Sequence, residues 1–310
     1  MRKQLCEALL NRAKNPHMIF LTGDLGFMAL EPLKKAMGSR FINAGVAEQN
    51  MMSVAAGLAH QQFEVWAYSI APFCYARPFE QIRNDITFHN LPVKLVGNGG
   101  GYGYGVMGPT HHAIEDYGVL LTLPNMSVYI PAFDEDVDEV IRRAGALAGP
   151  AYVRIGRGEP PQNYEVPRYA PWRQLTSGAG PVLITVGPIV GIYLDRIEKL
   201  PHDSRPNLWV VTELPLNRNP IPKQLLLQIQ TASLLCIAEE HVQHGGFAST
   251  LLLHLAQLGV AIPKFRHLFA QAHHFDRYGS QPFLRRQSKL DCESMLDAIT
   301  NDESDRHHLI

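Results

Sequence analysis

Cysteine is scarce in this sequence of 310 residues, which contains only four. None of them forms a Cys-x-x-Cys spacing, so neither a zinc cluster nor a disulfide framework is indicated; the four are Cys6, Cys74, Cys236 and Cys292. Isolated thiols of this kind are typical of a reducing compartment. We therefore expect a cytoplasmic protein.

Long apolar runs and an excess of one charge are also missing. No hydrophobic stretch approaches the roughly 20 residues that a membrane span needs, and the amphipathic N-terminal segment lacks the apolar region of a signal peptide. Charged residues make up 18% of the chain and the net charge is −1, so nothing favours a nucleic acid or an acidic membrane as partner. We expect a soluble globular protein that acts on small molecules or on another protein.

The two familiar glycine motifs for nucleotides are absent, although glycine is concentrated in one segment. Seven of the twelve residues from Gly97 to Gly108 are glycine, directly after a predicted strand, where open α/β sheets bind ligands. The segment is too long for a dinucleotide fingerprint and has no lysine for a P-loop. His111 and His112 follow, but neighbouring residues cannot share one helical face, which argues against a two-histidine metal site. We interpret the segment as a functional loop.

Apolar strand-like runs alternate with helical patterns along the first half of the chain. The predicted strands cover 18–22, 41–42, 64–68, 93–96, 127–130 and 151–155. The predicted helices cover the start of the chain to about residue 15, then 29–38, 46–61, 71–87, 112–121 and 134–147. This alternation predicts an α/β fold with a mainly parallel sheet that is covered by helices on both faces.

A proline-rich stretch separates this part from a second one. Residues 159–172 contain four prolines and no periodicity, which predicts a linker, placed at 161–178. Strand patterns then resume at 182–186, 208–212, 234–238 and 262–268. We therefore predict two α/β domains, 1–160 and 179–310, each a mainly parallel sheet flanked by helices.

Glu48 is the acidic residue in the first turn of a predicted helix, within the run RFINAGVAEQN at residues 40–50. A solvated acid favoured by the helix dipole is the ordinary interpretation. The helix, however, is apolar on nearly every side, and no lysine or arginine lies between Arg40 and Arg77. A buried carboxylate without a cation holds or shares a proton readily. We expect Glu48 to be buried, unpaired and able to share a proton with a ligand nitrogen.

Five motifs together resemble the C-terminal half of a transketolase, a thiamine-diphosphate enzyme. They are GDLG at 23–26, RFINAGVAEQN at 40–50, RPFEQIRND at 77–85, GPTHHAIED at 108–116 and LTLPNM at 121–126. The resemblance covers most of 18–158. It is weaker over 180–310, where it rests on the sheet pattern and on EEHVQHGG at 239–246.

The resemblance implies a cofactor site made by four residues. Glu48 would hydrogen-bond N1′ of the aminopyrimidine and so promote removal of the thiazolium C2 proton. Phe73 would stack on the pyrimidine, although by itself it is best interpreted as a core residue, and Leu25 and Ile70 would be its apolar neighbours. No residue of this chain is implied as a metal ligand.

The resemblance also implies a substrate site. His111 would hydrogen-bond the donor ketose near its reacting end as a second catalytic residue, and Arg157 would bind the terminal phosphate of the substrate. Two positions depart from the family: Gly99 stands where a phosphate-binding histidine is usual, and Met107 where an acid contacts the acceptor. The acceptor is therefore open, and we expect a larger or differently substituted sugar to use the space that Gly99 leaves.

Enzymes of this family hold the diphosphate through Mg²⁺ on a Gly-Asp-Gly motif, and that motif is absent from this sequence. The resemblance therefore implies one subunit of a split transketolase, in an α2β2 heterotetramer with a partner subunit that binds the diphosphate and Mg²⁺. Its reaction would be transfer of a two-carbon ketol unit from a ketose, expected to be phosphorylated, to an aldose.

Three alternatives remain open at this point. The β subunit of a 2-oxo acid dehydrogenase has the same layout, but it characteristically reads His-Ser-Gln where this chain has Thr110-His-His. A deoxyxylulose-phosphate synthase carries both halves on one chain. A non-catalytic scaffold subunit with the same fold is the third.

Overall fold

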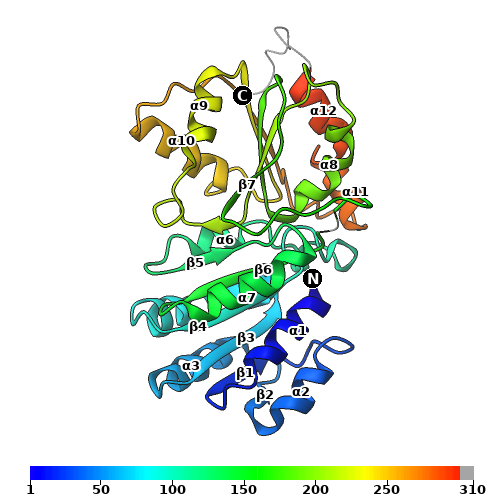
Figure 1. Ribbon diagram of the computed structural model, residues 1–310. Helices are drawn as coiled ribbons and strands as arrows, with labels where there is room; N and C mark the ends of the chain where they lie inside the picture. Colours follow the sequence, from blue (N-terminus) through cyan, green and yellow to red (C-terminus); the bar gives the residue numbers. More distant parts are fainter. Residues whose placement is uncertain (159, 301–310) are drawn as a thin grey trace.

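The computed structural model describes residues 1–158 and 160–300, which form two α/β units, one above the other in Figure 1. The elements of the first unit are α1 (Arg2–Arg12), β1 (Met18–Thr22), α2 (Glu31–Met37), η1 (Gly38–Arg40), β2 (Phe41–Asn43), α3 (Glu48–His60), β3 (Glu64–Ile70), α4 (Ala71–Tyr75), α5 (Phe79–Gln81), η2 (Ile82–Thr87), β4 (Val93–Asn98), η3 (Gly105–Met107), η4 (Pro109–His111), α6 (Asp116–Leu120), β5 (Ser127–Tyr129), η5 (Asp134–Asp136), α7 (Val137–Ala146) and β6 (Ala151–Ile155). Those that follow are β7 (Trp172–Thr176), β8 (Val182–Val186), η6 (Gly187–Ile189), α8 (Val190–Glu198), β9 (Asn207–Val211), β10 (Glu213–Leu214), α9 (Lys223–Thr231), β11 (Leu234–Glu239), α10 (Phe247–Gln257), β12 (Lys264–Phe269), α11 (Gln281–Gln287) and α12 (Cys292–Thr300).

The first sheet has the strand order β10-β5-β6-β4-β3-β1-β2, and all neighbouring strands in it are parallel except β10 and β5. Helices α1, α2 and α7 cover one face, where Phe20 and Trp66 lie, while α3 and α4 cover the other, where Ile19 and Leu21 lie. Because both faces are buried, a strand such as β1 is apolar throughout its length. This is why unbroken apolar runs, rather than alternating ones, predicted these strands.

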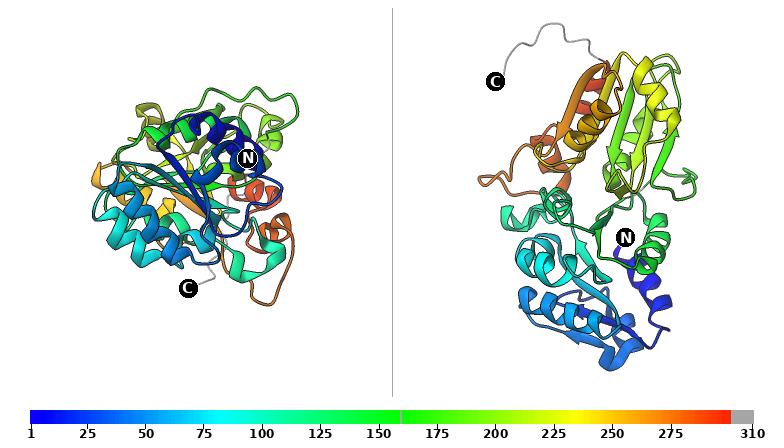
Figure 2. Two further views of the ribbon diagram at one scale, coloured as in Figure 1. Left: turned by 90° about the horizontal axis from the view of Figure 1, so that it is seen from below. Right: turned by 90° about the vertical axis from the view of Figure 1, so that its left-hand side faces the viewer.

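The second sheet has the strand order β12-β11-β8-β9-β7, with only β7 antiparallel to its neighbour. Helices α9 and α10 pack on one face, and α8 and α12 on the other. Figure 2 shows from two further directions how helices lie on either side of the sheets. The predicted fold class, two mainly parallel sheets flanked by helices, is confirmed.

Two predicted helices are wrong in extent. The helix expected at 71–87 is divided into α4, α5 and the π-helical turn η2. Pro78 separates α4 from α5, because it has no N–H to donate and its ring clashes with the carbonyl one turn earlier. The helix expected at 112–121 begins only at Asp116, because His112 is extended and ends the short turn η4.

The chain passes between the two units more than once. Strand β7 lies within the predicted linker 161–178 and forms the edge of the second sheet, whereas β10, from the predicted second domain, pairs with β5 of the first. Proline content and local periodicity do not indicate which sheet a short strand joins. The boundaries at 160 and 178 stay a prediction.

Buried polar contacts join the two units around Glu240. Its carboxylate accepts a hydrogen bond from the Tyr102 backbone at 2.9 Å and pairs with Arg285 at 2.7 Å. Its backbone carbonyl accepts from Arg154, which also pairs with Asp116 at 2.9 Å. The glycine-rich segment is therefore held between the units. Within the described residues, no helix is long and apolar enough to cross a bilayer.

Candidate active site

Five parallel strands of the first sheet end along one edge. The registers align Thr22 with Asn43, Ile70 with Asn98, and Asn98 with Ile155. Every predicted site residue lies at this edge or in a segment that leaves it: Leu25, Glu48, Ile70, Phe73, His111 and Arg157. In open α/β sheets, the carboxyl ends of the strands are where ligands bind.

Glu48 is the first residue of α3 and is 3% exposed, as the sequence predicts. It is not unpaired, however, because Nη1 of Arg77 donates to its two carboxylate oxygens at 3.1 and 3.0 Å. The expectation of a carboxylate without a cation is therefore wrong. Arg77 follows α4, 29 positions further on, and only the packing of α5 and η2 against α3 brings it to Glu48.

The helix that carries Glu48 is buried on one side only. Met51, Met52 and Ala55 are fully buried beneath the sheet, whereas Val54 is 40% exposed. A helix that is apolar on nearly every side is therefore not buried on every side. The exposed face of the helix includes Gln49, Asn50, Ser53, Val54 and Gly57.

Phe73 is half-buried and belongs to a cluster of rings and charges rather than to the core. The guanidinium carbon of Arg77 lies 3.9 Å from the centre of the Phe73 ring, a cation–π contact. The His111 ring meets the same ring edge-on, with the centroids 5.0 Å apart. Burial, together with the charge of Arg77, lowers the pKa of His111, so the imidazole is neutral at neutral pH. Glu48, Arg77, Phe73 and His111 thus form one continuous group.

Leu25 and Ile70 belong to the ends of two neighbouring strands at this edge, β1 and β3. The Leu25 carbonyl accepts a hydrogen bond from Thr22 at 3.1 Å, and Leu25 lines a small cavity of about 180 Å³ beside β1 and β2. Ile70 ends β3 and immediately precedes α4. A Cβ atom at Gly23 would lie only 3.7 Å from Glu48 Oε1, so the loop after β1 passes close to the carboxylate.

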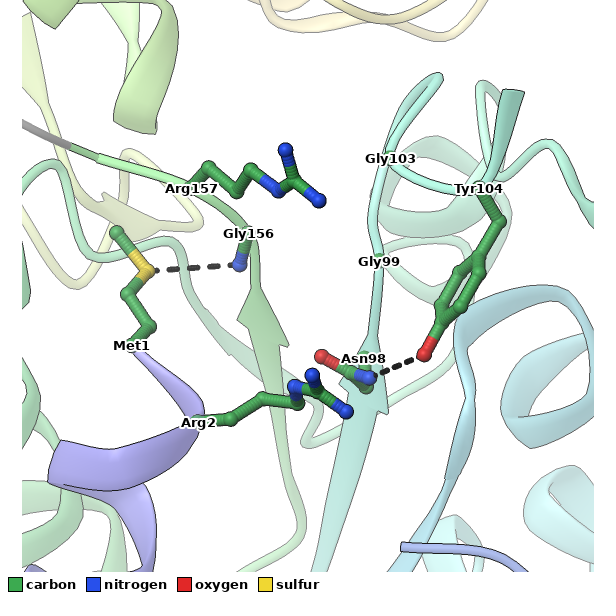
Figure 3. A pocket seen from close by; sticks show the side chains of 8 residues that line it. All are labelled: Met1, Arg2, Asn98, Gly99, Gly103, Tyr104, Gly156 and Arg157. Atoms are coloured by element: carbon green, nitrogen blue, oxygen red, sulfur yellow. Dashed lines mark hydrogen bonds between the residues drawn. The ribbon is translucent and has the colours of Figure 1, made fainter. Parts of the chain in front are cut away.

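Arg157 lines a separate cavity of about 300 Å³, shown in Figure 3. Arg2 of α1 extends its guanidinium into the same space. Neither arginine makes an ion pair within the described residues, and both line this cavity. Sequence reasoning missed Arg2, because a basic residue in an amphipathic helix carries no local signal of a site. The fold brings the start of α1 to the end of β6, where the Gly156 N–H contacts Met1 Sδ at 3.4 Å.

The glycine-rich loop closes the other side of this cavity. Gly99 adopts a left-handed φ of 79°, and a Cβ atom there would overlap the ring of Tyr104, which folds back over it. Tyr104 therefore occupies the space that a side chain at position 99 would take, so this space is not open as expected, although Gly99 itself lines the cavity. A larger or differently substituted sugar stays a prediction. Met107, the other position that departs from the family, is 56% exposed. The ring centres of Tyr104 and His111 are 6.4 Å apart, which links the cavity to the Glu48 group.

Comparison with known proteins identifies this arrangement. Residues 3–162 match the family model described as "Transketolase, pyrimidine binding domain". The chain belongs to the transketolase family. Membership of this family implies dependence on thiamine diphosphate, the cofactor predicted from the sequence. The relatives described next support the predicted role of the chain as a C-terminal transketolase subunit.

Two relatives of this transketolase-family chain are each named as one subunit of an apulose-4-phosphate transketolase. That of Phocaeicola vulgatus is 33% identical over 166 residues, 53% of each chain, and that of Actinobacillus succinogenes is 28% identical over 275 residues, 86% of each. A 1-deoxy-D-xylulose-5-phosphate synthase of Geobacter sulfurreducens is 32% identical over 285 residues. That match covers 90% of this chain and 44% of the synthase, so the chain spans less than half of such an enzyme.

Solved structures agree with this assignment. A structure titled "Split gene transketolase, inactive beta4 tetramer" superimposes with a TM-score of 0.79 and 27% identity, covering 96% of each chain. Transketolase from Campylobacter jejuni gives a TM-score of 0.73 at 16% identity and has the same fold, with 45% of its own chain covered.

The residues of this transketolase-family chain fit an aminopyrimidine. Arg77 presents a flat, nitrogen-bearing group that lies over Phe73 and donates to Glu48. These are the two interactions that a flat nitrogen heterocycle would make with the same pair. In addition, the hydroxyl of Ser69 is buried without a hydrogen-bond partner in the described part of the chain, and it lies beside the same glycine, Gly23, as Glu48 does.

Proposed function

We propose that this chain is the C-terminal subunit of a split transketolase, which transfers a two-carbon ketol unit from a phosphorylated ketose to an aldose. The observation that carries the proposal is the buried carboxylate of Glu48, which Arg77 joins to the half-buried ring of Phe73 at the carboxyl edge of the first sheet. The similarity along 96% of both chains to a split-gene transketolase supports a two-subunit enzyme.

The catalytic roles proposed for this chain follow from its contacts. Thiamine diphosphate supplies the carbon nucleophile, and Glu48 would hold its aminopyrimidine while Phe73, Leu25 and Ile70 surround the ring. Arg77 occupies that place beside Glu48 and Phe73, so it would have to move aside. His111 would donate or accept a hydrogen bond at the reacting end of the sugar as a neutral imidazole.

The substrate phosphate is proposed to bind between Arg157 and Arg2. Guanidinium groups bind phosphate oxygens through paired, charge-assisted hydrogen bonds, and two of them face one cavity here. Relatives named for a sugar phosphate support a phosphorylated substrate. Arg157 is thereby kept as the predicted phosphate ligand, with Arg2 added to it.

A partner subunit would supply the Mg²⁺ and the diphosphate site in an α2β2 assembly within the cytoplasm. Large apolar side chains are exposed in the loop between β1 and α2 and just before α3: Phe27 is 72% exposed, Met28 96% and Val46 74%. Exposed apolar clusters beside an active site are typical of subunit interfaces. The four thiols, none of them in a disulfide, suit a reducing compartment.

Reconstitution tests the proposal. This chain would be purified together with a partner of roughly 250–300 residues that carries the Gly-Asp-Gly motif, a length set by ordinary domain sizes. Ketol transfer would be followed across donor and acceptor sugars, with and without thiamine diphosphate. We expect transfer in the wild-type pair and none with Glu48→Gln, while the pair still assembles. A pair that binds no thiamine diphosphate, or a Glu48→Gln pair with near-normal turnover, would refute the proposal.

A second candidate, a synthase-type condensation, is favoured by the 32% identity to a deoxyxylulose-phosphate synthase. The same pair would be assayed for formation of 1-deoxy-D-xylulose 5-phosphate. Formation of this product, without ketol transfer between sugars, would replace the transketolase assignment.

A further inference from the structure

Tyr104 takes a place in the phosphate cavity that a side chain at position 99 would otherwise fill. The loop turns back on itself so closely that a Cβ atom at Gly103 would lie 2.8 Å from the Cα atom of Gly99. This tight turn lays the Tyr104 ring over Gly99, and both residues line the cavity together with Arg2 and Arg157. The two glycines therefore serve to position a tyrosine.

The hydroxyl of Tyr104 is held by Asn98. The Asn98 side-chain amide donates to Tyr104 Oη at 2.6 Å, and Asn98 itself is only 6% exposed, so its amide is fixed at the end of β4. Since the phenol oxygen accepts this bond, its own O–H proton remains available. The amide oxygen of Asn98 lies on the other side, towards Arg2 (Figure 3). The pair thus offers the cavity one donor and one acceptor.

Four side chains line the same cavity: in Figure 3 Arg157 and Arg2 lie above and below the space, and Asn98 and Tyr104 lie beside it. The ring of His111, outside the residues that line the cavity, lies 6.4 Å from that of Tyr104. An inorganic anion can accept hydrogen bonds from the two arginines and from the Tyr104 hydroxyl, but the amide oxygen of Asn98 repels its negative charge. A sugar hydroxyl, in contrast, accepts one hydrogen bond and donates another.

We propose that Tyr104 and Asn98 are specificity residues that recognise a hydroxyl next to the phosphate-bearing carbon of the substrate, while Arg2 and Arg157 hold its phosphate. This inference rests on the proposed phosphate site. It replaces the open space beside Gly99 with a defined hydrogen-bonding pair. The ligand class is a polyhydroxy monophosphate, and a phosphate ester without that hydroxyl is a poor ligand.

Binding to the full-length chain tests this with a matched pair of probes. Glycerol 3-phosphate and n-propyl phosphate have the same carbon skeleton and charge but differ in their hydroxyls, and their Kd values would be measured by ligand-observed NMR titration. One or two neutral hydrogen bonds correspond to a preference of about fivefold to tenfold for glycerol 3-phosphate in the wild type. Tyr104→Phe keeps the ring and removes the donor, so we expect the preference to fall below about twofold.

Two control variants separate the parts of the proposal. Tyr164→Phe changes a half-buried tyrosine that packs on Phe133 outside the cavity, and should keep the wild-type preference. Arg157→Ala should weaken glycerol 3-phosphate and n-propyl phosphate alike, by about tenfold or more.

The outcomes are distinct. The role of Tyr104 is overturned if the wild type shows no preference for glycerol 3-phosphate over n-propyl phosphate. It is also overturned if Tyr104→Phe keeps that preference. If Arg157→Ala still weakens binding of both ligands, the phosphate site stays intact. Loss of the preference in Tyr104→Phe, with the preference kept in Tyr164→Phe, supports the role of Tyr104. If the preference holds but the reconstituted pair performs no ketol transfer, the proposed reaction fails and this inference stands.

Discussion

Lys94 gives the stability of this protein a pH dependence whose size follows from the structure. It is the second residue of β4, is fully buried, and donates from Nζ to the carbonyls of Leu147 at 2.7 Å and Gly149 at 2.6 Å. Burial lowers the pKa of Lys94 to about 7, against 10.5 for the free side chain. The unfolded chain therefore binds more protons than the folded one between about pH 7 and 10.5, so stability rises with pH in this window.

The magnitude comes from the two pKa values. Their difference, at about 1.4 kcal/mol per pKa unit, corresponds to a cost of about 5 kcal/mol at pH 7 and below, where the folded protein must bury a charged ammonium. Between pH 7 and pH 9 the part recovered is about 2 kcal/mol. Lys94→Met abolishes this recovery. It also removes the donor for two carbonyls, at a cost of about 1–3 kcal/mol that does not vary with pH.

The assay is urea unfolding of the wild type, Lys94→Met and the exposed control Lys35→Met at pH 7, 8 and 9. Other groups titrate in all three proteins, so the difference in slope isolates Lys94. The wild type and Lys35→Met should gain about 2 kcal/mol more than Lys94→Met between pH 7 and pH 9. Parallel stability curves for wild type and Lys94→Met would refute the reasoning, because Lys94 would then have the same pKa in both states.

Three further predictions concern the site and its supports. Arg77→Met should lower the free energy of unfolding by about 1 kcal/mol in urea titrations, because it leaves Glu48 without its cation. The effect is modest since the Arg77 side chain is 45% exposed. Arg83→Met, at an exposed position of the same segment, should leave the free energy of unfolding unchanged. Glu240→Gln should cost about 3 kcal/mol, since it removes the anion that pairs with buried Arg285, and thermal unfolding that matches the wild type would contradict this. In the reconstituted pair, Arg157→Ala and Arg2→Ala should each raise KM for phosphorylated sugars far more than for unphosphorylated ones, whereas exposed Arg286→Ala should not; equal changes for both substrate classes would show that phosphate is not their ligand.

Local sequence pattern was sufficient for the framework of this protein. Buried parallel strands are apolar throughout, so β1, β3, β4 and β6 could be predicted to within a few residues from their composition alone. The same pattern placed Glu48 in the first turn of α3, and the specific motifs after each strand predicted the transketolase family. These features depend on neighbours within one helical turn or one strand, which a sequence displays directly.

Only the tertiary structure decided which groups meet at the site. Arg77 pairs with Glu48 across 29 positions of the sequence. Arg2, near the start of the chain, lines the same cavity as Arg157. Tyr104 fills the space beside Gly99. Each of these contacts depends on how helices and loops pack on the sheet, and side-chain direction in a glycine-rich turn has no periodicity that composition reveals. The sequence by itself therefore determined the fold and the principal carboxylate, whereas packing determined that carboxylate's partner and the shape of the phosphate cavity.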